Sequence, residues 1–181
     1  VYKRQDLRAM STTAVAQLST AQIRALGTEH VAGLSTAQVA NLTTEQVAAL
    51  ETADIRAMVS AQFAALTTAQ AEALSTEQIA AIETLDLRQL TTQAVAVLST
   101  AQVAALTTAQ AAALTNAQVA GMTTTQIEAL ETADLAAMTT AQVQALATAG
   151  AAALTTAQMV ALTSNQVAAL TTAQVQAFDT E

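Results

Sequence analysis

The chain has 181 residues and a mass of 18.4 kDa, the size of one domain or of one stretch of a repeat array. Six basic and 14 acidic residues give a net charge of −8, the wrong sign for wrapping nucleic acid or lying on an anionic membrane. The chain has no Cys and one His, which excludes a disulfide framework, a Cys-based zinc site and a multi-His metal site within one chain.

No targeting or membrane-spanning segment is visible in the sequence. The N-terminal residues are charged and lack the apolar stretch of a signal peptide. Thr, Gln or a charged residue interrupts every apolar run well before the roughly 18–20 residues that a membrane-spanning helix needs. We therefore expect no membrane insertion, although 52% of the residues are hydrophobic.

The whole chain is an internal repeat in which the pattern returns at every eighth residue. From residue 3 it divides into 22 octads that end at Phe178, and residues 179–181 begin another octad. The eighth position of every octad is Leu, Met, Ile or Phe, and the fifth is always apolar, most often Val, Ile or Leu. We expect residues 1–181 to form a single repeat array, excised from a longer protein, with positions five and eight facing the core.

This spacing favours a short helix that restarts in each octad. In one continuous α-helix, one octad turns about 800°, so the apolar stripe would wind around the helix and no long coiled coil can form. A β-solenoid is the alternative, but such solenoids usually need Gly or Asn at their corners. Four Gly residues cannot serve 22 repeats.

The predicted helices follow one another along the chain, in residues 3–10, 11–18 and 19–26 and so on to 171–178. A Ser or Thr that is followed three residues later by Gln matches the capping box that opens a helix. Ser19/Gln22 and Thr43/Gln46 are examples. The cap residue adopts extended dihedrals, so each octad can break the helix without Gly. Position two is also Thr in most octads, and the sequence does not decide which of the two hydroxyls is the cap.

A longer rhythm lies above the octad. Residues 3–18 recur as residues 83–98, and residues 51–58 recur as residues 131–138, both at an offset of ten octads. Ala replaces the larger apolar residue of position five at Ala71, Ala111 and Ala151, which follow one another at intervals of five octads. We predict about five octads per superhelical turn, with gene duplication as the alternative explanation of the rhythm.

Few residues are candidates for a chemical site. His30 takes the Gln position of its octad, which we interpret as a surface or capping variant because no partner residues recur with it. Pairs of acids at positions one and four could gather a cation, but acids at a helix N-terminus also interact favourably with the helix dipole, and no Asp-rich calcium loop is present. The pairs are Glu51/Asp54, Glu83/Asp86 and Glu131/Asp134.

Catalytic machinery is not predicted. The sequence has no Ser-His-Asp set, no Gly-rich phosphate loop and no basic-aromatic patch. Position six carries Arg8, Arg24, Arg56 and Arg88, which marks it as solvent-facing. We expect no enzyme activity and no catalytic, cofactor-binding or metal-binding residue. The abundant Thr residues suggest an ice-binding array or acceptor sites for O-linked glycans, but capping would already engage many of their hydroxyls.

Octads of the type Leu-Thr-Thr-Ala-Gln-Val-Ala-Ala resemble Ala/Thr/Gln-rich repeat tracts of large bacterial secreted or surface proteins, including adhesin-like ones. The resemblance covers nearly the whole chain and transfers no site residue. It implies a spacer or stalk that projects another domain, with an extracellular or cell-surface location, although a cytoplasmic one fits the composition equally well.

We therefore predict an all-α solenoid of very short helices that serves as a structural scaffold. Three other functions stay open: a module that binds a protein or glycan, a designed repeat scaffold and an ice-binding surface. We also expect that the uncapped ends of such an array can associate with each other.

Overall fold

The computed structural model describes residues 4–178, and every octad in that range contains one short α-helix. Each helix begins at the second residue of its octad and is four to six residues long. No strand occurs in residues 4–178, so the all-α prediction is confirmed and the β-solenoid is wrong. The helices are α1 (Arg4–Ala9), α2 (Thr12–Ala16), α3 (Thr20–Arg24), α4 (Thr28–Gly33), α5 (Thr36–Ala40), α6 (Thr44–Ala48), α7 (Thr52–Ala57), α8 (Ser60–Ala64), α9 (Thr68–Glu72), α10 (Thr76–Ala81), α11 (Thr84–Leu87), α12 (Thr92–Ala96), α13 (Thr100–Ala104), α14 (Thr108–Ala113), α15 (Asn116–Ala120), α16 (Thr124–Glu128), α17 (Thr132–Ala137), α18 (Thr140–Ala145), α19 (Thr148–Ala152), α20 (Thr156–Ala161), α21 (Ser164–Ala169) and α22 (Thr172–Ala177).

The residue at position one is the helix cap, which settles the choice that the sequence left open. Ser99, for example, has φ −66° and ψ 159°, and its hydroxyl accepts a hydrogen bond from the Gln102 backbone N–H. The position-two Thr is the first helical residue. No residue in the described part of the chain has a positive φ, so the corners are built from extended cap residues and need no special glycine.

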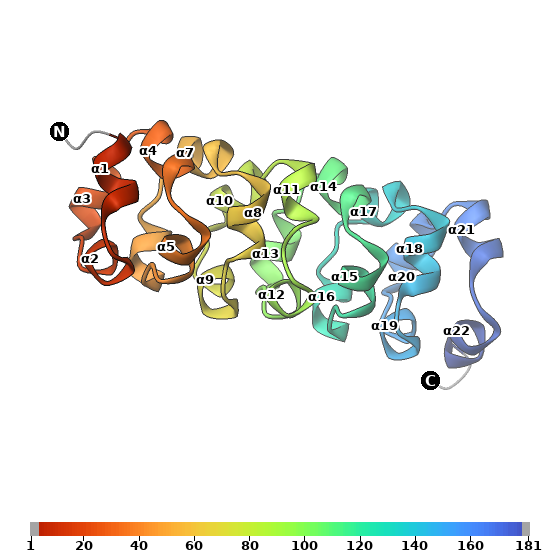
Figure 1. The fold of residues 1–181 in the computed structure, drawn as a ribbon. Coiled ribbons are helices and arrows are strands. Elements are labelled where there is room, and N and C mark those ends of the chain that lie inside the picture. Colours follow the sequence, from red (N-terminus) through yellow and green to blue (C-terminus); the bar gives the residue numbers. More distant parts are fainter. Residues whose placement is uncertain (1–3, 179–181) are drawn as a thin grey trace.

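The octads coil into an elongated superhelix with the two ends of the chain at opposite ends of the rod (Figure 1). Contacts between non-neighbouring helices join each helix to the third one along the chain, as in α4 with α7 and α14 with α17. Side-chain hydrogen bonds reach back by 28 and 31 residues, into the fourth octad before. One superhelical turn therefore takes between three and four octads, and the predicted five octads per turn are wrong.

The recurrence of the sequence after ten octads follows from this shorter turn. Ten octads make up three turns of between three and four octads each, so the chain then returns to an equivalent side of the rod. The helices α7 and α17, whose octads recur at this offset, both lie along the upper edge in Figure 1, as do α1 and α11. Five octads end halfway round a turn, so the Ala substitutions at position five do not mark a common side.

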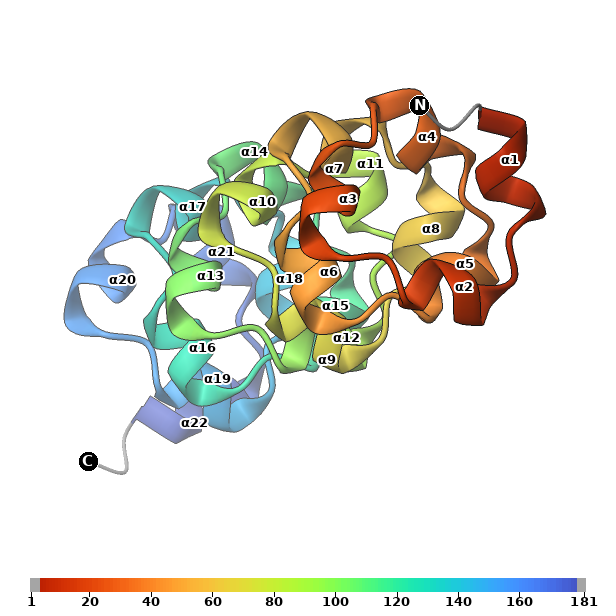
Figure 2. The same cartoon turned by 90° about the vertical axis from the view of Figure 1, so that its left-hand side faces the viewer.

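The core lies inside the superhelix and runs through most of its length. Positions five and eight fill it, and Phe63, Ile79 and Ile127 are at most 1% exposed. Viewed from the N-terminal end, successive turns stand one behind another, so each covers the apolar residues of the turn before it (Figure 2). Position six faces solvent, as Arg24 and Arg88 indicate, and Val160 at this position is 82% exposed.

Within residues 4–178, no helix has the length and hydrophobicity that crossing a membrane would require.

Candidate functional site

The most distinctive polar feature of the array is a buried glutamine at position four, exemplified by Gln118. Its side-chain oxygen accepts a hydrogen bond from the N–H of Thr115 at 2.8 Å, which completes the helix cap. Its amide nitrogen donates to the carbonyls of Leu87 and Leu90, both at 2.9 Å. A neutral amide has one acceptor oxygen and two N–H donors, so this one side chain is fully satisfied although it is only 1% exposed.

The same pair of bonds recurs along the rod and forms what we call the glutamine ladder. In each case Nε2 donates to the carbonyls of positions five and eight of the fourth octad before. The ladder consists of Gln38, Gln46, Gln62, Gln70, Gln78, Gln102, Gln110, Gln118, Gln126, Gln142, Gln158, Gln166 and Gln174.

The ladder explains why position four is an amide and not an acid. A Glu side chain could cap the helix as well as Gln does, because only an acceptor oxygen is needed. Yet Gln occupies position four in 14 of the 22 octads, and Glu in none. Only the amide supplies two donors for the carbonyls of the turn before, and a carboxylate there would face them with a like partial charge.

Sequence reasoning missed these long-range bonds. It assigned Gln to the cap alone and placed only positions five and eight inside. The missing signal was the absence of Glu from position four. Gln22 illustrates the difference: it caps Ser19 in the same way, but it lies in the third octad of the described chain, where it is exposed.

Two octads within the span of the ladder have a small residue in place of the glutamine. Ala94 and Gly150 are buried at position four and have no side-chain amide to donate. A methyl group added at Gly150 would contact Ile127 at 3.4 Å, so the larger neighbour partly occupies the space of the missing glutamine. Ala147, the cap residue of the same octad, makes no side-chain cap bond. The octad at 147–154 therefore lacks both the capping hydroxyl and the position-four amide that its two neighbouring octads have.

The acidic pairs are organised in another way. Asp54 Oδ2 accepts from the Glu51 N–H at 3.1 Å, as a capping residue does. Asp86 instead accepts from the Ser60 hydroxyl across the turn, and Asp134 likewise receives a hydrogen bond from the side chain of Thr108. In both of these pairs the donor precedes the acid by 26 residues. Asp86 and Asp134 therefore accept from the third octad back, whereas the amides of the ladder donate to the fourth.

These carboxyl groups are buried, and burial changes their acidity. Asp54 and Asp134 are each 3% exposed. Burial raises the pKa of both groups, and the nearby carboxylates Glu51 and Glu131 raise it further. No Lys, Arg or His lies after Arg88 in the sequence, so Asp134 has no cation nearby along the chain.

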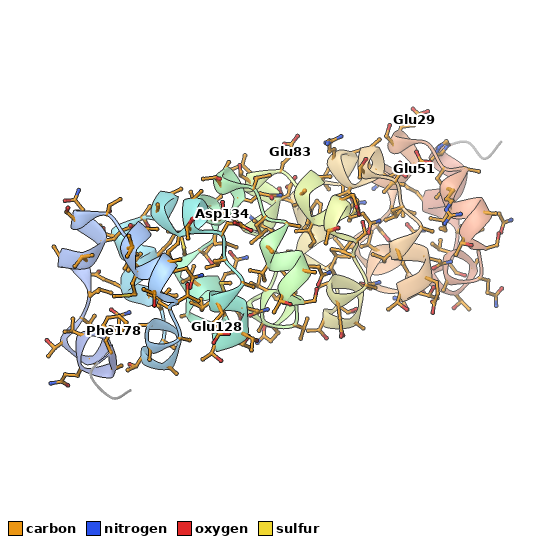
Figure 3. All side chains as sticks on the ribbon, turned by 180° about the vertical axis from the view of Figure 1, so that it is seen from behind. Glu29, Glu51, Glu83, Glu128, Asp134 and Phe178 are labelled. Carbon is orange, nitrogen blue, oxygen red and sulfur yellow. The ribbon has the colours of Figure 1, made fainter. Side chains whose placement is uncertain are left out.

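The remaining candidates have simple local roles. His30 Nδ1 accepts a hydrogen bond from the Gly27 N–H at 3.1 Å, which is the capping role that Gln plays elsewhere. Glu29 and Glu83 project from the upper edge of the rod in Figure 3, whereas Asp134 lies among the ribbons. Among the residues that the structure describes, no group of three or more His, Cys, Asp or Glu is placed to hold a metal ion.

The surface carries shallow open grooves between octads. One of about 500 Å³ is lined by Arg88, Asn116 and Thr139, together with alanines of α14. Another of about 250 Å³ lies near the C-terminal end, where Met159 and Phe178 contribute to its wall. Neither groove contains a cluster of ionisable side chains that would indicate acid–base chemistry.

Comparison with known proteins places this repeat in a described family. The family model of the ALTTAQ repeat matches six overlapping stretches that together cover most of the chain. No curated protein and no solved structure gives a significant match. The matched stretches are residues 4–36, 23–52, 47–81, 79–116, 127–164 and 152–180.

Proposed function

The chain belongs to the ALTTAQ repeat family, and we propose that it works as a structural spacer, a rod whose length is set by the number of octads. The observation that supports this most directly is the glutamine ladder. Because each rung joins an octad to the fourth one before it, octads can be added without any new kind of contact. The stability of such an array is the sum of repeat and neighbour terms, as in other solenoids.

The proposal is tested by deleting whole octads. Removal of three complete octads, residues 99–122, preserves the octad phase and should give a cooperatively folded rod with a proportionately smaller maximum dimension in small-angle scattering. Removal of residues 99–118, two and a half octads, breaks the phase and should abolish cooperative unfolding. A phase-preserving deletion that leaves the maximum dimension unchanged would contradict the spacer function.

We further propose an extracellular or cell-surface location, on the basis of the resemblance to repeat tracts of bacterial secreted and surface proteins. An antibody raised against the array tests the location in the native organism. Labelling of intact cells, or recovery of the protein from the culture medium, is the expected result. Labelling only after the cells are permeabilised would contradict it.

End-to-end association is a further part of the proposal. At position five, Val103 and Val143 are fully buried, whereas Val167 and Val175 in the last turn are 48% and 47% exposed. A further turn of the same repeat would cover these two side chains. When the 181-residue chain is alone in solution, the end of a second copy can provide that turn. Sedimentation should then show a concentration-dependent larger species that V167E/V175E removes and V160E does not. Equal sedimentation of all three proteins would refute the association.

A further inference from the structure

The octad that carries Asp134 departs from the ladder in a way that leaves one oxygen of a buried acid without a hydrogen-bond partner. Asp134 stands at position four of α17, where the neighbouring octads have Gln126 and Gln142. Its Oδ2 atom is buried and is the one such side-chain atom in the described residues that makes no hydrogen bond. Buried polar atoms of folded proteins nearly always have a partner, so this orphan atom calls for a physical explanation.

The register of the ladder identifies the two carbonyls that lack a ladder bond at this octad. Gln126 donates to the carbonyls 31 and 28 residues before it, those of Val95 and Leu98. The equivalent carbonyls for Asp134 belong to Val103 and Leu106, and both residues are buried. Here an acid stands where the ladder has an amide, so the donor of the ladder is missing. The seam between the octads at 99–106 and 131–138 thus lacks the two ladder bonds, and Asp134 Oδ2 is buried without a partner. The Val103 carbonyl still accepts the N–H of Leu106 at 3.1 Å.

The electrostatic surroundings offer nothing else to compensate a negative charge. The helices packed against α17 are α14 and α20, and neither contains a titratable or charged residue. α13, which lies at the other side of the seam, contains none either. Glu131, on the same octad, is the charged group that acts on the pKa of Asp134, and it is another acid that raises it. A hydrogen bond from the Thr108 side chain acts in the opposite direction.

We propose that the Asp134 carboxyl group makes a protonation-dependent hydrogen bond between successive turns of the rod, which we call the tie. In the protonated form, Oδ2 carries a hydrogen and becomes the missing donor to the turn before, as the amide of Gln is elsewhere. In the ionised form, the carboxylate has no hydrogen to donate, and the seam is weaker by that bond. The proton exchanges with solvent, so the step needs no other reactant.

The direction of the pH effect follows from burial. Because burial raises the pKa of Asp134 in the folded chain, the unfolded chain loses this proton first as the pH rises. The contribution of Asp134 to stability is therefore complete below the ordinary aspartate pKa and is lost as the pH rises through the raised value. The tie is closed below the ordinary aspartate pKa and opens as the pH rises through the raised value.

The tie lies on one edge of the rod. Beyond the first octad, an acid at position four occurs in α7, α11 and α17, and all three helices run along the upper edge in Figure 1. Opening at Asp134 therefore loosens the rod on that edge and leaves the glutamine ladder on the other sides intact. A local change in protection, and not global unfolding, is the expected consequence.

The experiment uses the full chain and two matched variants, D134N and E131Q. Asparagine has nearly the shape of aspartate but cannot ionise, and Glu131 is an exposed acid at the cap of the same helix. The Asp134 carboxyl carbon should titrate by NMR above the ordinary aspartate value. Amide protection factors around Leu106 and Leu135, corrected for intrinsic exchange, should fall several-fold in the wild type and in E131Q as the pH rises through the measured titration of Asp134. In D134N they should not fall over the same pH range. The proposal is overturned if Asp134 titrates at or below the ordinary value, or if D134N shows the same fall as the wild type.

Discussion

The side-chain amide of Gln118 donates a hydrogen bond at 2.9 Å to the main-chain carbonyl of Leu90, which lies 28 residues earlier in the chain. This relationship links the chemistry of one residue to the pitch of the whole superhelix, because a residue can serve the fourth octad before it only if a turn takes fewer than four complete octads. The same bond recurs along the rod, so the buried amides at position four follow the octad period, as the buried apolar side chains at positions five and eight do.

Gln118→Glu tests the role of the two donors. The acid can still cap the helix at Thr115, but at neutral pH its second oxygen faces the carbonyls of Leu87 and Leu90. Loss of two buried hydrogen bonds should lower the free energy of unfolding by roughly 2–5 kcal/mol. Part of the loss should be recovered in acid, where the carboxyl group is protonated. Urea unfolding at both pH values measures the effect.

Gln22→Glu is the matched control for that change. Gln22 makes the same cap bond but is exposed in the described chain. Its replacement should change the free energy of unfolding by no more than about 0.5 kcal/mol. Similar losses in the two variants would mean that the ladder bonds contribute nothing beyond the cap.

The apolar core is tested at Ile127, which is 1% exposed at position five. Ile127→Ala should destabilise the array by about 2–5 kcal/mol, because it removes buried methyl groups and leaves a cavity between turns. Val160→Ala, at a position that is 82% exposed, should change stability by less than about 0.5 kcal/mol. Thermal unfolding followed by circular dichroism compares the two variants.

The octad at 147–154, which has no capping side chain, offers a stabilising change. Ala147 has the extended conformation of a cap residue, with φ −56° and ψ 150°, but no side chain that can accept a hydrogen bond. Ala147→Ser should supply the acceptor for the Gly150 N–H and raise the free energy of unfolding by about 0.5–2 kcal/mol. Ala149→Ser, at an exposed helical position, should give no gain. If both variants have the stability of the wild type, capping does not limit this octad.

Much of the fold could be predicted from the sequence because short-range patterns within each octad determine it. The Ser/Thr-x-x-Gln spacing fixes where each helix begins, and the apolar residues at positions five and eight fix which face is buried. Phe63 and Ile79 were thus predictable core residues. The number of octads per turn was not, because it depends on bonds between residues 28 and 31 apart that no local pattern encodes. The recurrence at five octads was misleading, since a turn takes between three and four octads and five octads do not return to the same side of the rod.

For the buried polar groups, too, the local contacts could be predicted from the sequence and the contacts between turns could not. The octad pattern predicts that Gln102 caps its own helix, and the structure shows the bond from the Ser99 N–H at 2.7 Å. The pattern does not predict that the Gln102 amide is buried against Ala71 and Leu74, because these contacts form only when turns stack. The special position of Asp134 likewise becomes visible only against the ladder.

The most direct test of this account is the proton contacts of the Gln118 side-chain amide, measured by NOE spectroscopy on the isotope-labelled chain. The ladder predicts cross-peaks from this amide to protons of Leu87, Leu90 and their immediate neighbours, in addition to those within its own octad. Cross-peaks confined to residues 115–122, or cross-peaks to residues about five octads earlier, would contradict it.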